Sequence, residues 1–498
     1  MSGPAGLRAF LDERCAARGD AVFLWFRGQT WSYADLAAIT DGAASAFCRL
    51  GLVRGDRVAL LMPNGPEAVF TWLALAKLGA VTAPIHSQLT APEVGAALSR
   101  LEPRALVVDE TLSDRVSATP PGLRTIGPEL QEILSSRDPL TGVDAPAPED
   151  PADILMTSGT TGRPKGVVQS HRTFVLTGEA FAHWLGLTPE DRLFTCLPLS
   201  HVNARAYSTM GALASGGSLA LEDRFSASRF WGWLADSAAT QCNTIGAMLQ
   251  IMLKAPPGAA DRAHRVRLVY NAPALGQEAH LAFERRFGVR LVIGYGLSES
   301  TFGFVHPLQG ERRLDSMGRL RSHPDQRFGN EARLVAEGRD VGPGQIGEIW
   351  LRNPATFSGY FRDEEATREV LTADGWLRTG DLARRDTGGW HTFVGRDKEI
   401  IRRRGENIAP AEVEAALESH PSVKEAAVVG APSALGEEEV AAFVVLAPGA
   451  NATEEELRAH AAARLAPFKV PSIWRFIDEL PRTPTRRVAR HLLRTQGG

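Results

Sequence analysis

The sequence predicts an α/β fold with a large N-terminal domain and a small C-terminal domain. Short apolar runs typical of buried strands, such as 57–62, 105–108 and 291–293, are separated by segments that carry helix start signals. Strands that alternate with helices favour a largely parallel sheet. The 498 residues are enough for two or three domains, and 44% hydrophobic and 23% charged residues are ordinary for a globular protein.

Capping and turn residues mark the first helices. Ser32 and Asp35 have the spacing of a capping box, which predicts a helix that runs from there toward Leu50. Pro66 follows an Asn-Gly turn and is well placed to open an apolar helix that runs to Leu78.

The next elements continue the alternation. The apolar runs 81–85 and 105–108 predict strands, and Thr90 with Glu93 predicts a capped helix between them. Segment 138–150, which contains several prolines and a glycine, predicts a loop that leads into the next apolar run.

The pattern changes in the last quarter of the chain. Near 388–390 it shifts to short strands and turns, and a compact tail follows residue 396. We therefore expect a domain over residues 1–395 with parallel-rich sheets and helices, and a small mobile α+β domain over 396–498.

Charge and cysteine usage exclude several classes of protein. The net charge of −3 offers no general attraction to nucleic acid or to an anionic membrane. The four cysteines have no metal-ligand spacing, and no apolar run reaches the length of a membrane span. These observations predict a cytoplasmic protein with neither nucleic acid nor membrane as partner. The oligomeric state stays open, with a homodimer as one alternative.

A Gly- and hydroxyl-rich loop follows the apolar run 154–156. Its glycines allow close approach of the backbone to a ligand, and its hydroxyls and Lys165 suit a polyphosphate. The spacing is neither that of a Walker loop nor that of a dinucleotide fingerprint. The candidate phosphate-binding residues are Thr157, Ser158, Gly159, Thr160, Thr161, Gly162 and Lys165.

The whole string 157–166 resembles the phosphate loop of the adenylate-forming superfamily, which includes acyl- and aryl-CoA synthetases, peptide-synthetase adenylation domains and luciferases. The resemblance covers essentially the whole chain and is nearest to carnitine-type small-acid CoA ligases. It implies an enzyme that uses ATP and Mg²⁺ to activate an acid as its adenylate, releases pyrophosphate, and passes the acid to a nucleophile such as CoA.

Several further segments carry this resemblance. The resemblance implies that Tyr295 stacks on adenine and that Glu299 helps to hold magnesium, for which a carboxylate oxygen is a suitable ligand. It implies that Asp381 and Arg396 meet the ribose and that Asp397 is a hinge, and segment 402–408 resembles the CoA-forming members. The adenine segment consists of Gly294, Tyr295, Gly296, Leu297 and Ser298.

Three segments depart from the family pattern, and the third is 200–205, where relatives often have an aromatic residue before the histidine and a neutral residue near position 205. Arg486 and Arg487 stand where relatives usually have Gly-Lys, and the resemblance implies that Arg487 takes the place of a catalytic lysine. Because guanidinium is bulkier and planar, this exchange either preserves or alters the adenylation chemistry. In the nucleotide-side segment Asn271, Ala272 and Pro273, relatives commonly have glycine at the first position, so the asparagine either occupies a left-handed turn or contacts the ligand.

The resemblance also implies which residues border the acid, namely His201, Arg205 and Gly246. An arginine in the pocket would select a substrate with a second anionic or strongly polar group. The alternative is that Arg205 points outward or pairs with an internal carboxylate.

Three hypotheses follow. The first is an AMP-forming ligase that joins a small or aromatic carboxylic acid to CoA. The second is an ATP-dependent diazotase of natural-product biosynthesis, which would activate nitrite and act on an aromatic amine. The third is a nucleotide-binding protein that has lost catalysis.

Overall fold

The chain forms two compact units. The computed structural model describes residues 6–116, 119–157, 165–272, 274–396, 399–403, 406–432, 438–465, 467–482 and 488–494. The first unit contains Met1–Thr157, Lys165–Ala332 and Leu351–Leu377, and the second contains Arg333–Trp350 and Arg378–Gly498. The predicted α/β class is confirmed. The boundary at 396 and the hinge at Asp397 stay predictions, and Asp397 lies outside the described residues.

A seven-stranded sheet carries the predicted phosphate segment. Its inner strands are parallel, whereas β8 pairs antiparallel with both β7 and β19 at one edge. In sheet order the strands are β19 (Gly359–Tyr360), β8 (Lys165–Ser170), β7 (Pro151–Thr157), β4 (Val81–Ile85), β3 (Arg57–Leu61), β5 (Ala105–Val108) and β6 (Arg124–Ile126).

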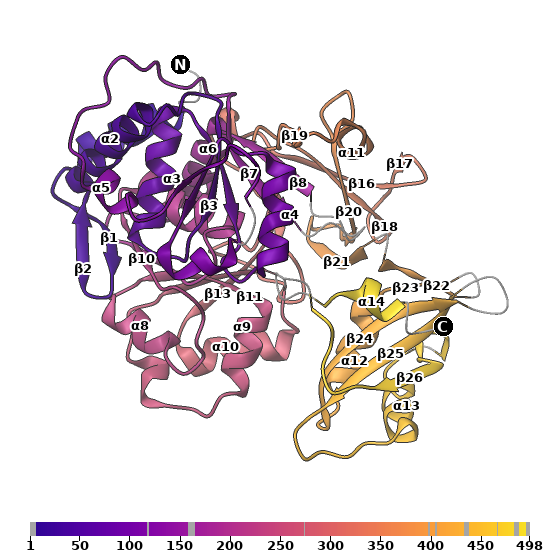
Figure 1. Ribbon diagram of the computed structural model, residues 1–498. Coiled ribbons are helices and arrows are strands. Elements are labelled where there is room, and N and C mark those ends of the chain that lie inside the picture. Colours follow the sequence, from indigo (N-terminus) through magenta and orange to yellow (C-terminus); the bar gives the residue numbers. More distant parts are fainter. Residues whose placement is uncertain are drawn as a thin grey trace. The chain divides into compact units, whose positions relative to one another are not determined.

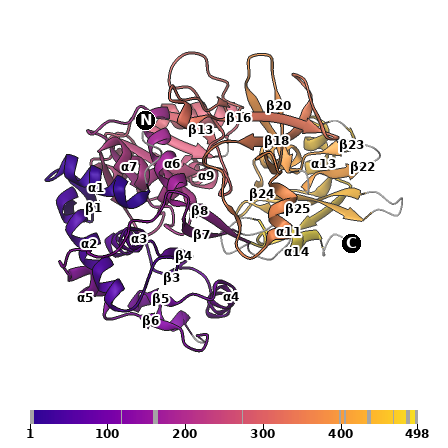
Figure 2. The ribbon, with the colours of Figure 1, turned by 90° about the horizontal axis from the view of Figure 1, so that it is seen from above.

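Helices cover both faces of this sheet. Alternate residues of β3 point to opposite faces, so Val58 packs with α2 and α3 while Ala59 packs with α4. Figure 1 and Figure 2 both show β3 between α3 and α4. The helices of the first unit are α1 (Leu7–Arg18), α2 (Tyr33–Arg49), α3 (Pro66–Leu78), α4 (Ala91–Leu101), α5 (Leu130–Ser135), α6 (His171–Trp184), α7 (Met210–Ser215), α8 (Phe230–Asp236), α9 (Gly246–Lys254), α10 (Gln277–Phe287) and α11 (Glu364–Val370).

The local sequence signals explain where these helices begin. Ser32 and Asp35 form the predicted capping box of α2, and Thr90 and Glu93 form that of α4. Pro66 is the first residue of α3, as its fixed φ favours. These three predictions are confirmed.

A nine-stranded sheet forms the rest of the first unit's framework. Its central strands β9 to β13 are parallel, and β13 ends at the predicted adenine segment. In sheet order the strands are β15 (Arg319–Leu320), β14 (Phe304–Val305), β13 (Arg290–Tyr295), β12 (Leu268–Ala272), β11 (Gln241–Ile245), β9 (Arg192–Thr195), β10 (Ser218–Leu221), β1 (Val22–Phe26) and β2 (Gln29–Ser32).

The second unit takes most of a five-stranded sheet and all of the C-terminal elements. In its three-stranded sheet, α12 and α13 cover one face and α14 covers the other, and Figure 2 shows α13 and α14 on opposite sides of β24 and β25. The elements are β16 (Glu331–Ala336), β17 (Arg339–Asp340), β18 (Ile346–Arg352), β20 (Leu377–Arg385), β21 (His391–Arg396), β22 (Ile401–Arg403), β23 (Glu406–Ile408), β24 (Val423–Pro432), β25 (Glu438–Leu446), β26 (Ile473–Phe476), α12 (Pro410–Glu418), α13 (Glu454–Ala462) and α14 (Arg490–Arg494).

Candidate active site

The predicted phosphate segment connects the two strands of a β-hairpin. β7 and β8 pair antiparallel, so the last residue of β7, Thr157, lies opposite the first residue of β8, Lys165. The Thr157 hydroxyl donates to the Lys165 carbonyl at 3.3 Å. The hairpin thus holds the lysine at the base of the loop. Several predicted site residues lie outside the described residues, namely Ser158, Gly159, Thr160, Thr161, Gly162, Pro273 and Arg487.

Lys165 and Glu299 both contact the side chain of Tyr360. The Lys165 ammonium lies 4.5 Å from the centroid of the Tyr360 ring. The Tyr360 hydroxyl donates to Glu299 Oε1 at 2.9 Å. The structure therefore brings together two of the predicted catalytic residues through a third residue.

Sequence reasoning missed Tyr360. It belongs to β19, a strand of only two residues, which pairs with β8 although the two are far apart in the chain. Neither period nor capping marks so short a strand. A Gly-Tyr-Phe run was the only available signal, and it carries no chemistry on its own.

The adenine segment begins at the end of β13. A side chain at position 294 would collide with the ring of Tyr270, and a side chain at position 296 would lie 2.6 Å from the Tyr207 hydroxyl. Both glycines are therefore explained by close packing. Tyr295 is 9% exposed and its ring lies 5.6 Å from that of Phe304.

Hydrogen bonds fix the far end of this segment to the phosphate strand. Gln169 of β8 donates through Nε2 to the Ser298 carbonyl. The Leu297 amide donates to the Ser300 carbonyl at 2.8 Å, and the Phe357 amide donates to the Glu299 carbonyl at 2.8 Å. The backbone on either side of Glu299 is thus held from two directions.

Asn271 and Gly246 lie at the ends of neighbouring parallel strands. Asn271 is fully buried in β12, opposite Thr244 of β11, and their side-chain oxygens are 3.0 Å apart. The left-handed turn considered for Asn271 is wrong, because the residue continues a strand. Ala272 ends β12, and Gly246 begins α9 directly after β11.

The acid-side segment forms a π-helix over Asn203–Thr209. π-Helical turns are rare in proteins as a whole, and those that occur are often found at functional sites. His201 precedes it, and its ring lies 5.5 Å from that of His86, which follows β4. The structure thus places His201 near the end of β4, the strand next to β7.

Arg205 is not a pocket cation. It is 2% exposed, its Nη1 lies 2.7 Å from Asp153 Oδ2, and its guanidinium lies 4.6 Å from the Trp72 ring centroid. Its Nε donates to the Leu199 carbonyl at 2.6 Å. The expectation that Arg205 binds the substrate's second polar group is therefore wrong, because a buried carboxylate neutralises its charge. The alternative, an internal ion pair, is confirmed.

Burial dominates the protonation of this pair. It raises the pKa of the Asp153 carboxyl, and the Arg205 charge opposes that rise. It also lowers the pKa of the Arg205 guanidinium, and the Asp153 charge opposes that fall. Each charge therefore depends on the other, as expected for two ions that have left water together.

The second unit holds the predicted ribose residues. Asp381 and Arg396 are opposite each other in β20 and β21, and Arg396 Nε donates to Asp381 Oδ1 at 2.8 Å. Gly380 before the aspartate has a φ of +69°, which glycine adopts without strain. Within the 402–408 segment, Arg403 is 8% exposed and pairs with Glu439 at 2.6 Å, so its charge is used internally.

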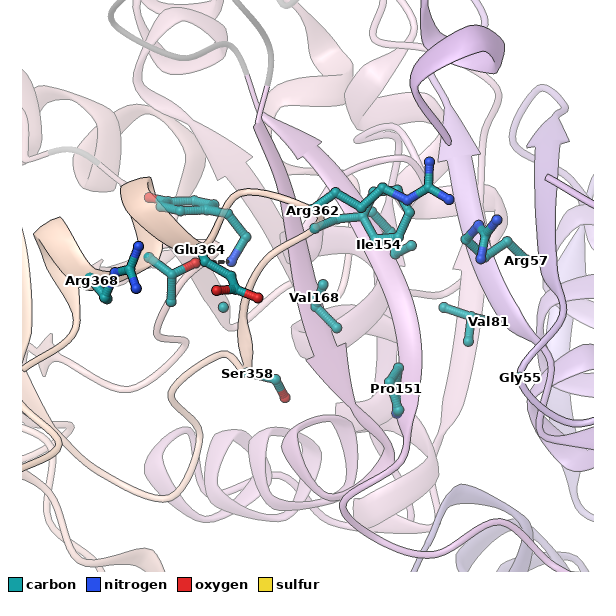
Figure 3. Close-up of a pocket in the computed structure, with 14 residues that line it drawn as sticks. Gly55, Arg57, Val81, Pro151, Ile154, Val168, Ser358, Arg362, Glu364 and Arg368 are labelled. Carbon is teal, nitrogen blue, oxygen red and sulfur yellow. Dashed lines mark hydrogen bonds between the residues drawn. The ribbon is translucent and has the colours of Figure 1, made fainter. Parts of the chain in front are cut away.

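A groove of about 500 Å³ lies over the opposite face of β7 and β8. Figure 3 shows Pro151, Ile154 and Val168 along these strands, with Arg57 and Arg362 at one side. None of the predicted site residues lines this groove. Tyr360, which contacts both Lys165 and Glu299, is nevertheless among its lining residues, so the groove adjoins the candidate active site.

Glu299 fits the donor set of a nucleotide-bound magnesium. Among the described residues, no three His, Cys, Asp or Glu side chains gather as a metal site. Magnesium on a nucleotide is held by one or two carboxylates together with phosphate oxygens. The half-buried Glu299, close to the phosphate strand, meets that requirement.

No helix in the described part of the chain is long and apolar enough to cross a membrane.

Comparison with known proteins places these features in a family. The AMP-binding enzyme family matches residues 11–361, and the AMP-binding enzyme C-terminal domain matches residues 412–487. A sulfoacetate–CoA ligase of Cupriavidus necator is 35% identical over 97% of this chain and 96% of its own length. A crotonobetaine/carnitine–CoA ligase of Escherichia coli is 34% identical over 93% of each chain.

Solved structures agree with this placement. ATP-bound MatB of Rhodopseudomonas palustris has a TM-score of 0.88 at 27% identity and covers 99% of both chains. O-succinylbenzoate coenzyme A synthetase of Bacillus subtilis, in complex with ATP and magnesium ion, has a TM-score of 0.86 at 26% identity over 97% of this chain and 98% of its own. With both family domains matched in order and whole-chain relatives that are CoA ligases, the chain belongs to the AMP-binding enzyme family.

Proposed function

We propose that this protein is an ATP- and Mg²⁺-dependent, AMP-forming ligase that joins a small or aromatic carboxylic acid to CoA. The observation that carries the proposal is the contact of Lys165 and Glu299 with one tyrosine at the base of the phosphate loop. The contact supports the proposal, because a cation and a carboxylate that contact one side chain beside this loop suit a polyphosphate and its metal. The CoA ligases among the relatives support CoA as the acceptor.

On the phosphate side, Lys165 and the loop hydroxyls neutralise and orient the ATP phosphates. Glu299 would hold the magnesium ion, and bound magnesium would supply further charge neutralisation on those phosphates. Arg487 is proposed to bring its guanidinium to the α-phosphate and the acid in place of a lysine.

On the nucleoside side, the proposed roles follow the family resemblance and the local geometry. Tyr295 stacks on adenine, within a segment held by Gln169 and by Phe357. The Asp381 carboxylate accepts hydrogen bonds from the ribose hydroxyls, with Arg396 beside it. The family's hinge role is assigned to Asp397.

The reaction then proceeds in two displacements. A carboxylate oxygen of the acid attacks the α-phosphorus, the bond to the β-phosphate oxygen breaks, and pyrophosphate leaves. The CoA thiolate attacks the carbonyl carbon of the acyl-adenylate, and AMP leaves with the electron pair of the acyl–oxygen bond. The protein contributes mainly positioning and stabilisation of charge on the phosphates.

The acid is proposed to meet His201 and the start of α9 at Gly246. Arg205 takes no part in acid binding, because Asp153 neutralises it inside the core. The comparisons give no support for nitrite and an arylamine as substrates, since the relatives are CoA ligases.

AMP release tests the proposal. Protein with ATP, magnesium and CoA is incubated with a panel of carboxylic acids, and AMP and acyl-CoA are quantified by mass spectrometry. A parallel series replaces the acids and CoA with nitrite and amino-hydroxyaryl acids. We expect AMP and acyl-CoA in equal amounts with at least one acid, and a slower adenylation step in Arg487→Ala than in Arg487→Lys. AMP that forms only in the nitrite series would overturn the proposal, and nucleotide binding without any AMP would indicate lost catalysis.

A further inference from the structure

The segment 357–361 is bonded both to the phosphate strand and to the loop that carries Glu299. On one side, the Phe361 amide donates to the Gly166 carbonyl at 2.7 Å and the Ser358 amide donates to the Val168 carbonyl at 2.9 Å. On the other side, the Phe357 amide donates to the Glu299 carbonyl at 2.8 Å. A short strand therefore ties together two loops that the sequence predicts to share one ligand.

Tyr360 is the residue of this segment whose side chain meets both functional groups. Its hydroxyl donates to Glu299 Oε1 at 2.9 Å, and its ring lies 4.5 Å from Lys165 Nζ. The next residue, Phe361, packs with the apolar cluster on the other face of the sheet, as strand alternation requires. Position 360 is thus the one that reaches the site.

The backbone at Tyr360 is anchored independently of the site. The Tyr360 amide donates to Thr367 Oγ1 at 2.9 Å, and that hydroxyl donates to the Asp363 carbonyl at 2.8 Å. The Tyr360 ring also packs edge-on against Phe357, with 5.0 Å between the ring centroids. The side chain that touches Lys165 and Glu299 therefore has little freedom to move away from them.

The two contacts have opposite electrostatic characters. A phenol hydroxyl that donates to a carboxylate forms a charge-assisted hydrogen bond and engages one of the two oxygens. An ammonium over an aromatic face is held by the ring quadrupole and not by a counter-charge. Lys165 and Glu299 are both among the described residues, and they form no ion pair with each other. Neither charge is therefore cancelled by the other.

We propose that Tyr360 is a positioning residue, which holds Lys165 and Glu299 in place while keeping their charges available to a phosphate and a magnesium ion. The inference rests on the proposed function. The ring positions the lysine and the hydroxyl positions the carboxylate, so the two effects separate in two substitutions. Tyr360→Phe removes the hydroxyl and keeps the ring, and Tyr360→Leu removes both.

Magnesium-dependent nucleotide binding tests the proposal without turnover. Binding of the non-hydrolysable α,β-methylene analogue of ATP is measured by calorimetry at a series of magnesium concentrations. For Tyr360→Phe we expect the magnesium concentration at half-saturation to rise about tenfold, the scale of a lost hydrogen bond to a charged group, with unchanged analogue affinity at saturating magnesium. For Tyr360→Leu we expect analogue affinity to fall even at saturating magnesium, by about threefold or more.

Phe361→Leu is the matched control. It alters the residue directly after β19 but packs with the apolar cluster, so its magnesium dependence should equal that of the original protein. A melting temperature for each variant reports any general loss of structure. The Tyr360→Phe change should also have no further effect on magnesium dependence in a Glu299→Gln background, because Tyr360 acts through that carboxylate.

The outcomes distinguish this inference from the proposed function. Magnesium-dependent binding that is equal in the original protein and in Tyr360→Phe would overturn the positioning role and leave the ligase proposal intact. Additive effects of Tyr360→Phe and Glu299→Gln would overturn the route through Glu299. Failure of the original protein to bind the analogue at any magnesium concentration would overturn both.

Discussion

Lys165 and Arg205 are cations that the sequence assigned to one active site, yet the fold gives them opposite environments. Lys165 is half-buried and lies against the ring of Tyr360. Arg205 is almost fully buried and pairs with Asp153, while its guanidinium stacks on Trp72. The first retains its charge for a ligand, whereas the second has it neutralised by the core.

The difference shows what makes a cation functional. A carboxylate placed against a buried guanidinium makes the pair a structural unit, because each ion leaves water only with the other. An aromatic ring beneath an ammonium orients it without cancelling its charge. The side chain that lies against a cation therefore determines whether the cation stabilises the fold or stays available to a ligand.

The largest expected effect is on stability, in Arg205→Met. This change leaves the fully buried Asp153 without its counter-ion, and we expect the free energy of unfolding to fall by about 3–5 kcal/mol. Urea denaturation followed by tryptophan fluorescence measures it. A loss below about 1 kcal/mol would contradict the buried ion pair, since exposed pairs contribute no more than that.

Lys165→Met should give the reverse of Arg205→Met, with a large loss of activity and little change in stability. We expect kcat/KM with the best acid to fall by about 10²- to 10³-fold, as when one charge-stabilising donor is removed from an active site. The free energy of unfolding should change by no more than about 0.5 kcal/mol, because the lysine is half-buried and held by a ring. Lys424→Met, at an exposed position of β24, is the control. A destabilised Lys165→Met protein with normal turnover would reverse the comparison.

Much of the fold follows from local signals in the sequence. The capping boxes at Ser32 and Thr90 and the proline at position 66 mark the starts of α2, α4 and α3. The antiparallel pairing of β8 was not predicted, although the Gly-rich loop before it has the composition of a turn. Its pairing with β19 could not be predicted, because it depends on contacts between distant segments.

The sequence predicted the site residues that stand in a motif, and it did not predict those whose role depends on which side chains pack against them. Lys165, Tyr295 and Asp381 stand in motifs, and the structure places them within or at the ends of strands. Arg205 also stands near a motif, but its partner Asp153 lies in a buried strand with no polar pattern around it. Tyr360 has no motif of its own. The wrong prediction for Arg205 and the missed Tyr360 have one cause. Each depends on which side chain lies against a charged group in the folded chain, and a single sequence does not contain that information.

Acid unfolding probes the opposite end of the strand that begins with Lys165. His171 follows β8, is fully buried, and burial lowers its pKa from 6.5 to about 4. Since the folded pKa is depressed, the stabilisation is complete above pH 6.5 and is lost as pH falls from 6.5 toward 4. Over this pH range we expect His171 to lower the free energy of unfolding by up to about 3 kcal/mol, measured by urea unfolding at each pH. A pH profile unchanged in His171→Gln would contradict it.

The smallest effect is expected when both members of the buried pair are made neutral, in Arg205→Gln with Asp153→Asn. The double variant leaves no isolated charge, and the amide oxygen introduced at position 153 still accepts from the Thr82 hydroxyl, which in the original protein donates to Asp153 at 2.6 Å. We expect most of the stability lost in Arg205→Met to return, with a remaining deficit of about 1–2 kcal/mol. KM for the acid should change by less than about threefold, which is well under 1 kcal/mol. If Arg205 instead bound the substrate, this stable double variant would lose acid affinity as severely as any single variant at position 205. Recovery of folding without recovery of acid binding would therefore assign Arg205 to the pocket after all.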